Sequence, residues 1–366
     1  MPLSDIYIRA DATSLIGVGH FARCLNLAKK LEKRGVSITF LSRNLPKNMA
    51  KQAIYAGCRV IDLYPAHDGR PQLADDYGSW LGVTQEEDFF QCMEYVNETS
   101  NCFFIIDHYG VNDEWLAHAR FAGAKVMIFD DLAERKLDVD IVVNQNLGWT
   151  NEHYVDLIGP NTNLLLGPKY AVLSENYFQE RLCTHRKFDE HGALRVLISL
   201  GGSDPNNVSE KIARCLISLD FSSDFLVSIA VGPLNRNLDA LSDLAFSAKG
   251  KVKLFVGQDS LVNVYSENDI AIGAVGGSSW ERCCLGLPTI LVPVADNQLP
   301  AAHALQEVGA GITVDYKDEQ FEFALKCALE TICNKSVRQE MSLNSMKICD
   351  GQGADRLAKK LIDFDG

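Results

Sequence analysis

The stretch DIYIRADATSLIGVGHFARCLNLAKKLEKRGVSITFLSR, residues 5–43, decides the fold. Two short apolar runs, at 5–11 and 37–43, enclose an amphipathic segment that begins near residue 21. Runs this apolar are typical of strands that are covered on both faces, and a strand–helix–strand order makes the two strands parallel. Residues 5–43 therefore predict one βαβ unit of a doubly wound α/β sheet.

The same alternation continues along the chain with one interruption, the loop-rich stretch 147–190. This pattern predicts two tandem Rossmann-like doubly wound domains, residues 1–190 and 191–335, followed by C-terminal helices at 336–366 that can pack back on the first domain. Because such sheets bind ligands at the carboxyl ends of their strands, we expect the active site in the cleft between the domains. The further apolar runs lie at 59–64, 103–109, 125–131, 141–146, 195–202, 225–232, 251–257, 269–277, 289–294 and 311–316.

Composition narrows the class of function. The chain has 366 residues, 47% hydrophobic and 23% charged, which is ordinary for a folded protein of about two domains. Its 35 basic and 48 acidic residues give a net charge of −13, which argues against nucleic acid and anionic membranes as partners. The 11 irregularly spaced cysteines and the lack of a signal peptide predict reduced thiols and a cytoplasmic protein of unspecified oligomeric state. No apolar run approaches the ~18 residues of a membrane span.

The loop between the first strand and the first helix carries the main candidate for chemistry. Gly17 and Gly19 allow a ligand to approach the backbone closely, and His20 follows at the start of the helix. A helix N-terminus favours the uncharged imidazole, which is the form that acts as a general base. We therefore expect His20 as the catalytic base, with Asp11, Gly17, Gly19 and Arg23 at the substrate.

Two other interpretations of this loop are open. The stretch GVGHFA, residues 17–22, loosely fits the dinucleotide-binding pattern GxGxxA. That fingerprint follows its strand directly, however, and needs an acidic residue after the second strand, where Arg43 stands instead. A histidine at the start of a helix can also be a capping or packing residue.

A second group of polar side chains follows the apolar run at 103–106. Tyr109 can hydrogen-bond to a sugar or stack on its ring, and the alternative is a tyrosine of the core. Asp107 and His108, with Asp130 or Asp131, also allow a metal site as an alternative, although nothing in the sequence fixes their mutual spacing.

Two glycine-rich turns in the second half of the chain are candidates for binding a phosphate. Gly201 and Gly202 follow a predicted strand and can present backbone N–H groups to an anion. Gly277, Ser278 and Ser279 open a predicted helix, and their N–H groups and hydroxyls suit a diphosphate.

Side chains after the second of these turns complete the expected substrate site. Glu281 lies three residues after Ser278, the interval of a capping box, and it can also accept hydrogen bonds from ribose hydroxyls. Asn297 and Gln298 follow the next predicted strand and offer uncharged donors and acceptors, which suit sugar hydroxyls or amides.

Seven stretches, in one order, resemble a known family. Together they cover the chain from about residue 5 to about residue 310 and resemble the hydrolases of UDP-2,4-diacetamido-2,4,6-trideoxy-β-L-altropyranose in pseudaminic acid biosynthesis. The resemblance implies the two-domain fold of the glycosyltransferase-B superfamily. The stretches are GVGHFARC (17–24), DHYG (107–110), FDDLAERKLDVDIVVNQN (129–146), LLLGPKYAVL (164–173), SLGGSDPNN (199–207), GGSSWERCCLGLP (276–288) and ADNQ (295–298).

The resemblance also implies roles for individual residues. It places the nucleotide on the C-terminal domain, with the segment Ser278–Glu281 at the phosphates and the ribose. It makes His20 the residue that activates water, with Tyr109 and Asn297 in the sugar pocket, and it implies neither a metal nor a cofactor. Attack by water from the side opposite UDP then inverts the anomeric centre. The insertion-like stretch 65–82 departs from the family pattern, and we expect it to affect which sugar fits.

Three other functions fit parts of the pattern. A glycosyltransferase of the same fold needs an acceptor site, but KKLEKRG at 29–35 is an ordinary solvated face and no apolar patch for a lipid acceptor. A non-catalytic nucleotide-sugar-binding protein would not need both His20 and Asn297. A nucleotide-sugar 2-epimerase that also hydrolyses its substrate has a cluster of catalytic carboxylates that is not evident here.

Overall fold

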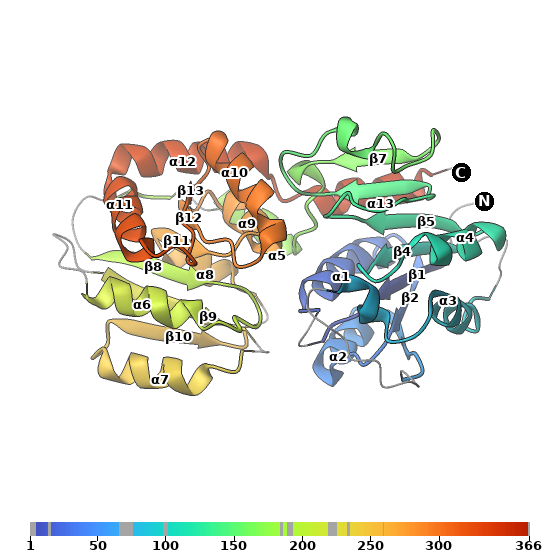
Figure 1. Ribbon diagram of the computed structural model, residues 1–366, viewed down its shortest axis with the longest axis horizontal. Helices are drawn as coiled ribbons and strands as arrows, with labels where there is room; N and C mark the ends of the chain where they lie inside the picture. Colours follow the sequence, from blue (N-terminus) through green and yellow to red (C-terminus); the bar gives the residue numbers. More distant parts are fainter. Residues whose placement is uncertain are drawn as a thin grey trace. The chain divides into compact units, whose positions relative to one another are not determined.

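The computed structural model describes residues 5–13, 16–65, 76–97, 102–183, 186–188, 193–218, 225–232, 235–258 and 260–364. The chain forms two compact units, one of Met1–Val172 with Gln352–Gly366 and the other of Leu173–Gly351. Each unit contains one sheet whose paired strands all run parallel, with helices packed on it (Figure 1). The prediction of two Rossmann-like doubly wound domains is confirmed.

The sheet of the first unit has seven strands in the order β3-β2-β1-β4-β5-β6-β7. The direction of strand addition reverses at β1, between β2 and β4, and ligands bind at such switch points in doubly wound sheets. The strands are β1 (Asp5–Ala10), β2 (Ser37–Ser42), β3 (Arg59–Asp62), β4 (Phe103–Asp107), β5 (Lys125–Phe129), β6 (Ile141–Asn144) and β7 (Asn163–Leu166). The helices are α1 (Gly19–Glu32), α2 (Lys47–Tyr55), α3 (Gln85–Met93), α4 (Asp113–Phe121) and α13 (Gly353–Ile362), with short 3₁₀ helices η1 (Tyr77–Leu81), η3 (Asn151–Tyr154) and η4 (Pro168–Tyr170).

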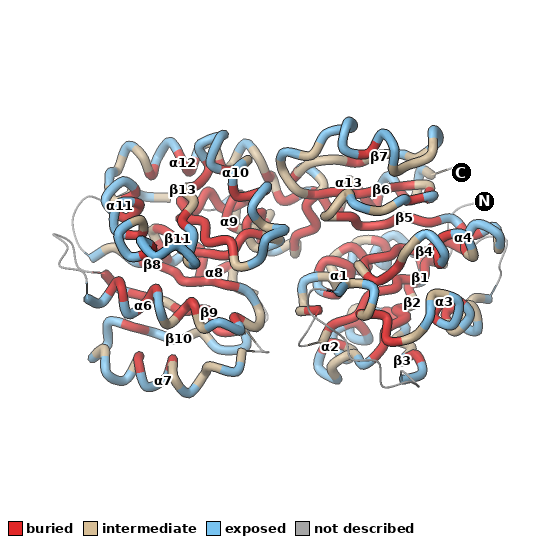
Figure 2. The backbone as a smooth tube through the Cα atoms, in the orientation of Figure 1, coloured by how far each residue is buried: buried red, intermediate tan, exposed pale blue. Residues whose placement is uncertain are grey.

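Alternate side chains of β1 pack on opposite faces of this sheet. Ile6 and Ile8 are fully buried in a cluster with side chains of α1 and α13, whereas Tyr7 joins a cluster with side chains of α3 and α4. Leu357 and Leu361 contribute α13 to the first cluster. Because both faces are covered, the inner strands β1, β4, β5 and β6 are buried along most of their length, whereas the outer strands β3 and β7 are partly exposed (Figure 2).

The sheet of the second unit has six strands in the order β10-β9-β8-β11-β12-β13, with its switch point between β8 and β11. The strands are β8 (Leu194–Ser199), β9 (Phe225–Val231), β10 (Val252–Val256), β11 (Ile270–Gly273), β12 (Thr289–Leu291) and β13 (Ile312–Thr313). The helices are α5 (Glu175–Cys183), α6 (Val208–Ser218), α7 (Leu238–Ser247), α8 (Val262–Glu267), α9 (Gly277–Cys284), η5 (Asp296–Gln298), α10 (Leu299–Glu307), α11 (Phe321–Cys333) and α12 (Lys335–Ile348).

The limits of the two units differ from the boundaries expected at residues 190 and 335. Helix α5 belongs to the second unit, because Arg181 donates hydrogen bonds to the carbonyl oxygens of Cys284 at 2.8 Å and Cys349 at 3.1 Å. Helix α12 also stays with the second unit, and α13 is the helix that returns to the first. The loop-rich composition of 147–190 indicates where the chain passes from one unit to the next, but it does not indicate on which unit α5 packs. Within the described ranges, every helix is too short or too polar to cross a lipid bilayer.

Candidate active site

The expected site residues lie at or near the carboxyl ends of the strands of both sheets, with one group in each unit. The first unit holds Asp11, Gly17, Gly19, His20, Arg23 and Tyr109, and the second holds Gly201, Gly202, Gly277, Ser278, Ser279, Glu281, Asn297 and Gln298.

His20 lies in the first turn of α1, and its ring contacts the end of β4. The Nδ1 atom of His20 is 2.6 Å from Oδ1 of Asp107. Arg23 donates from Nε and Nη2 to the two oxygens of the same carboxylate, at 2.5 and 2.7 Å. Burial alone would raise the pKa of Asp107, but the charges of Arg23 and His20 outweigh burial and hold this pKa below its ordinary value of 3.8.

This pair fixes which nitrogen of His20 can act as a base. Asp107 is a carboxylate, so it accepts a hydrogen bond from Nδ1–H of His20. In the uncharged ring the proton on Nδ1 leaves the lone pair on Nε2. The His20 side chain is 12% exposed, so part of the ring reaches solvent. A histidine oriented by a buried carboxylate is the base-and-orienter arrangement of many hydrolytic enzymes.

Tyr109 packs beside this histidine. The two ring centroids are 4.7 Å apart and the rings meet edge to face. The Tyr109 hydroxyl donates a hydrogen bond to Oδ2 of Asp131 at 2.9 Å, and burial together with the charge of Asp131 raises the pKa of this tyrosine. Asp131 also pairs with Arg23 at 2.8 Å, so Asp107, Arg23, Asp131 and Tyr109 form one connected network around His20.

The helix η1 also packs against Tyr109. Trp80 is stacked on the Tyr109 ring, with centroids 5.7 Å apart and planes 18° apart, and Tyr77 meets the same ring at 5.0 Å. Both residues come from the stretch 65–82 that departs from the family pattern, of which 66–75 lie outside the described residues. The described end of that stretch is therefore part of the site, because it holds Tyr109 in place.

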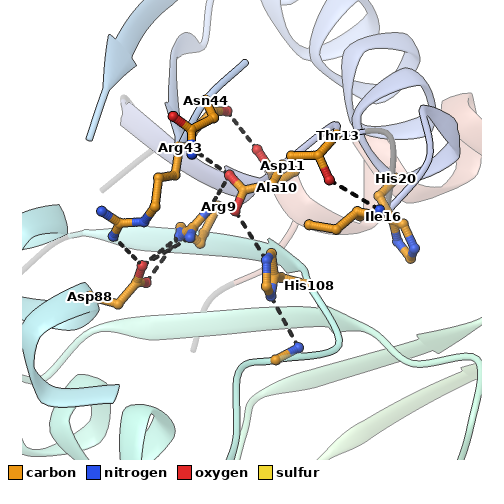
Figure 3. Close-up of polar contacts among 12 residues, drawn as sticks. Arg9, Ala10, Asp11, Thr13, Ile16, His20, Arg43, Asn44, Asp88 and His108 are labelled. Atoms are coloured by element: carbon orange, nitrogen blue, oxygen red, sulfur yellow. Dashed lines mark hydrogen bonds and ion pairs between the residues drawn. The ribbon is translucent and has the colours of Figure 1, made fainter. Parts of the chain in front are cut away.

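A second buried network holds Asp11, as Figure 3 shows. Its carboxylate accepts hydrogen bonds from Arg9 at 2.6 Å and from the backbone N–H of Arg43 at 2.7 Å. Nε2 of His108 is 3.1 Å from the same carboxylate. The backbone N–H of Gly110 donates to Nδ1 of His108, so the proton of the uncharged ring lies on Nε2 and faces Asp11. Asp11 is 2% exposed and all of these partners are internal, which favours a positioning role over contact with a substrate.

Asp88 extends this network away from the site. It accepts hydrogen bonds from Arg9 and Arg43, each at 2.9 Å, and from the indole N–H of Trp115 at 3.1 Å. Burial would raise the pKa of Asp88, but the two arginines outweigh burial and lower it. Each of these buried arginines is thus neutralised by a carboxylate within the first unit.

The side chains of the alternative metal site have other partners in this structure. Nowhere in the described part of the chain do three or more His, Cys, Asp or Glu side chains converge as metal ligands would. Asp107 is occupied by His20 and Arg23, and His108 faces Asp11.

Three residues of this site were not expected as site residues from the sequence. The sequence suggests Asp107 and Asp131 only as ligands of a metal, and it gives no indication of Arg135. Arg135 donates to the carbonyl oxygens of Tyr109, at 2.7 Å, and of Val111, which holds the DHYG turn closed. The adjacent acids in FDDLAER, directly after an apolar run, are the signal that could have directed attention to Asp131.

In the second unit, β11 leads through a glycine turn into α9. Gly277 is exposed, Ser278 is half-buried and Ser279 is buried. The backbone N–H of Gly276, the N-cap residue, donates to Oγ of Ser279 at 3.3 Å. The expected capping box between Ser278 and Glu281 is therefore wrong, because the helix begins earlier than that box requires.

Glu281 turns away from the helix start. Its carboxylate accepts a hydrogen bond from the Tyr265 hydroxyl at 3.2 Å. Burial raises the pKa of Glu281, while hydrogen bonds from Tyr177 and Tyr265 act against that shift. A ribose hydroxyl at this carboxylate would share it with Tyr265.

Loops after β8 and β12 end at the same sheet edge. Gly201, with φ of +91°, and Gly202 form the turn after β8. Oε1 of Gln298 accepts the backbone N–H groups of Val275, at 3.3 Å, and Val294, at 3.0 Å. Gln298 thus links the loop after β11 to the loop after β12, and its neighbour Asn297 is exposed.

Several known proteins are similar to this chain in sequence. A model of the glycosyltransferase family 28 C-terminal domain matches residues 196–361. An uncharacterised protein of Methanocaldococcus jannaschii is 25% identical over 78% of this chain and 55% of its own length, so the chain spans about half of that relative. The UDP-2,4-diacetamido-2,4,6-trideoxy-β-L-altropyranose hydrolase of Campylobacter jejuni is 25% identical over 85% of this chain and 99% of its own length.

The solved structure of UGT2 from Phytolacca americana, complexed with UDP-2fluoro-glucose and pterostilbene, is similar to this chain with a TM-score of 0.70. The alignment covers 100% of both chains at 12% identity. The fold is glycosyltransferase-B-like. The expected fold is confirmed by this likeness, and the family 28 match lies almost entirely within the second unit.

Proposed function

We propose that this protein hydrolyses UDP-2,4-diacetamido-2,4,6-trideoxy-β-L-altropyranose to UDP and the free sugar, a reaction of pseudaminic acid biosynthesis. The observation that carries the proposal is the 2.6 Å contact between Nδ1 of His20 and Asp107 at the carboxyl edge of the first sheet. The Campylobacter jejuni relative, which is named for this reaction and aligned over 99% of its length, supports the choice of substrate.

The proposed reaction breaks the bond between the anomeric carbon and the diphosphate oxygen. Nε2 of His20 takes a proton from a water molecule while the water oxygen attacks the anomeric carbon, and the electron pair of the broken bond leaves with UDP. Asp107 keeps the ring in the required tautomer and stabilises the imidazolium that forms. Attack from the side opposite UDP inverts the anomeric centre.

The other residues of the first unit position the sugar and the base. The Tyr109 hydroxyl donates a hydrogen bond to Asp131. The phenolic oxygen can therefore accept a hydrogen bond from a sugar hydroxyl or amide. Arg23 keeps Asp107 charged, and Gly17 and Gly19 let the substrate approach the backbone. Asp11 is assigned a positioning role here because its carboxylate is buried.

The proposal assigns the nucleotide to the second unit. The first backbone N–H groups of a helix have no partner within it, so the turn at Gly277 and Ser278 suits the diphosphate. Gly201 and Gly202 offer further N–H groups, and Glu281 accepts from the ribose. Asn297 completes the sugar site, with Gln298 holding its loop in place.

A hydrolysis assay with a matched variant tests the proposal. The protein is incubated with the UDP-sugar and water alone, and UDP release is measured. We expect His20→Asn to lose about 10²–10⁴-fold in kcat, as removal of a general base does, while UDP binding persists. His303→Asn, a change at an exposed histidine of α10, serves as the control. Full activity of His20→Asn would remove this histidine from the mechanism.

A glycosyltransferase is the second candidate, and the match to the family 28 C-terminal domain favours it. The same histidine would then take the proton of an acceptor hydroxyl in place of water. UDP release that begins only after an acceptor alcohol is added would decide for the transferase, and release in water alone would decide for the hydrolase.

A further inference from the structure

Arg282 is a buried cation at the start of α9. Its side chain is 1% exposed. Nη2 donates to the carbonyl oxygen of Ala274 at 2.6 Å and to Oγ of Ser279 at 3.1 Å, and Nη1 donates to Oγ of Ser278 at 3.2 Å. The Nε atom is buried and makes no hydrogen bond within the described part of the chain. The acceptors of this guanidinium lie in the turn after β11 and in the first turn of α9.

No carboxylate of the described residues forms an ion pair with Arg282, unlike the buried arginines of the first unit. Arg9 and Arg43 pair with Asp88, each at 2.9 Å, and Arg23 pairs with Asp107 at 2.5 Å. A buried charge without a counter-charge is costly, so it is found where other groups, often a ligand, compensate for it.

The adjacent Glu281 does not fill that role. Its carboxylate is directed to the hydroxyl of Tyr265 at 3.2 Å. Burial raises the pKa of Glu281 even though the charge of Arg282 acts to lower it. The carboxylate of Glu281 therefore has the Tyr265 hydroxyl, and not the guanidinium, as its hydrogen-bond partner.

Strand β11 ends in a glycine, Gly273, against which the guanidinium of Arg282 packs. A Cβ on Gly273, the last residue of β11, would lie 2.6 Å from Nη1 and 2.8 Å from Cζ of Arg282. The backbone of Gly273 does not have a positive φ, so the glycine is not required by the conformation of the strand itself. The guanidinium of Arg282 therefore occupies the space that a side chain at position 273 would need.

We propose that Arg282 positions and charges the turn that binds the diphosphate, an inference that rests on the proposed nucleotide site. Oγ of Ser278 accepts from Arg282, so the hydroxyl proton of Ser278 is free to donate outward to a phosphate oxygen. The hydroxyl of Ser279 instead faces the carbonyl of Ala274 at 3.5 Å. The positive charge of Arg282 adds to that of the helix N-terminus and stabilises the charge that grows on UDP as the bond breaks.

The test compares the affinities of the full-length protein for UDP and for uridine. UDP is titrated by calorimetry, and uridine is followed by ligand-observed NMR, which measures weak binding. We expect Arg282→Met to weaken the binding of UDP by about 10–100-fold and to leave the affinity for uridine within about twofold, because the lost charge and the lost hydrogen bond to Ser278 act on the phosphates and not on the nucleoside. Arg282→Lys keeps the charge and should recover part of the UDP affinity.

Two further variants separate this role from a purely structural one. Gly273→Ala keeps the arginine but displaces its guanidinium, so it should weaken the binding of UDP and not that of uridine. Within the described residues, the guanidinium of Arg186 donates to the backbone carbonyls of Leu285, Asn268 and Tyr265. Arg186→Met should therefore lower the melting temperature and leave the ratio of UDP to uridine affinity unchanged. The proposal would be overturned if Arg282→Met lowered the affinities for UDP and uridine equally, or lowered neither of them.

The outcomes also distinguish this inference from the proposed hydrolysis. If the wild-type protein binds UDP in an Arg282-dependent manner but releases no UDP from the sugar nucleotide in water, the hydrolase is refuted and the role of Arg282 stands. If hydrolysis proceeds and UDP binding ignores Arg282, the hydrolase stands and the role of Arg282 is refuted. Failure of the wild-type protein to bind UDP would refute this inference together with the nucleotide site.

Discussion

Replacing Asp107 by asparagine removes one negative charge from the centre of the candidate active site. The carboxylate is fully buried and contacts Nδ1 of His20 at 2.6 Å. With the two charge centres about 4 Å apart and an effective dielectric constant of about 20, the carboxylate stabilises an imidazolium by about 4 kcal/mol. Since 1.36 kcal/mol corresponds to a tenfold change in rate, we expect Asp107→Asn to lower kcat by about 10³-fold.

The fold should survive this change. Arg23 loses one carboxylate partner but keeps Asp131, at 2.8 Å. A lost hydrogen bond to a charged group costs about 1.5–3 kcal/mol, and a protein with 5–15 kcal/mol of stability tolerates that loss. Thermal unfolding monitored by circular dichroism checks the fold, and UDP calorimetry checks that the nucleotide still binds.

Asp131→Asn is the matched control for Asp107→Asn. It removes the other carboxylate from Arg23 and leaves the contact between His20 and Asp107 in place. We expect it to raise KM through Tyr109 and to lower kcat much less than Asp107→Asn does. A kcat for Asp107→Asn within tenfold of wild type, or an equal loss of kcat in both variants, would refute the assignment of Asp107 as the partner of the base.

Three further changes test the supporting structure. Burial lowers the pKa of His108 below its ordinary 6.5. The contribution of this histidine to stability is therefore complete above pH 6.5 and is lost as the pH falls through the folded-state pKa. Urea titrations from pH 7 to 5 should show a free energy of unfolding that falls with pH, and His108→Gln should remove this dependence. Trp80→Ala deletes a buried indole that is stacked on Tyr109. It should lower the free energy of unfolding in urea by about 3–5 kcal/mol and also lower kcat/KM. Gly353→Ala places a Cβ 2.2 Å from the carbonyl oxygen of Ala171 and should cost about 1–3 kcal/mol, whereas Gly19→Ala, whose Cβ meets nothing within 4 Å, should cost much less in the same titration.

The element pattern was predictable because strands covered on both faces must be apolar throughout. The run 5–11 becomes β1, Asp5–Ala10, and the run 37–43 becomes β2, Ser37–Ser42. The unit boundaries were not predictable in the same way. The polar segment around α5 is compatible with either unit, and the contacts of Arg181 that decide the matter join residues more than a hundred positions apart.

The candidate base was predictable, but its partner was not. The rule of switch points places the loops after β1 and β4 beside one another, which brings His20 close to the end of β4. It does not say which nearby acid meets the imidazole, because Asp107, Asp130 and Asp131 all follow neighbouring strands. The choice depends on side-chain reach over 87 positions of sequence, and the sequence alone does not supply that distance.

An acidic chain that binds an anion must arrange its positive charge locally. The net charge of −13 repels a diphosphate at long range, so the proposed site has to attract it through groups that lie close to it. In the first unit the buried arginines Arg9, Arg23 and Arg43 are already neutralised by carboxylates. In the described part of the second unit, Arg282 is buried beside a helix N-terminus without such a partner. A cation held in a low-dielectric interior acts strongly over a short range, which is why the sign of the whole chain says so little about the sign of its ligand.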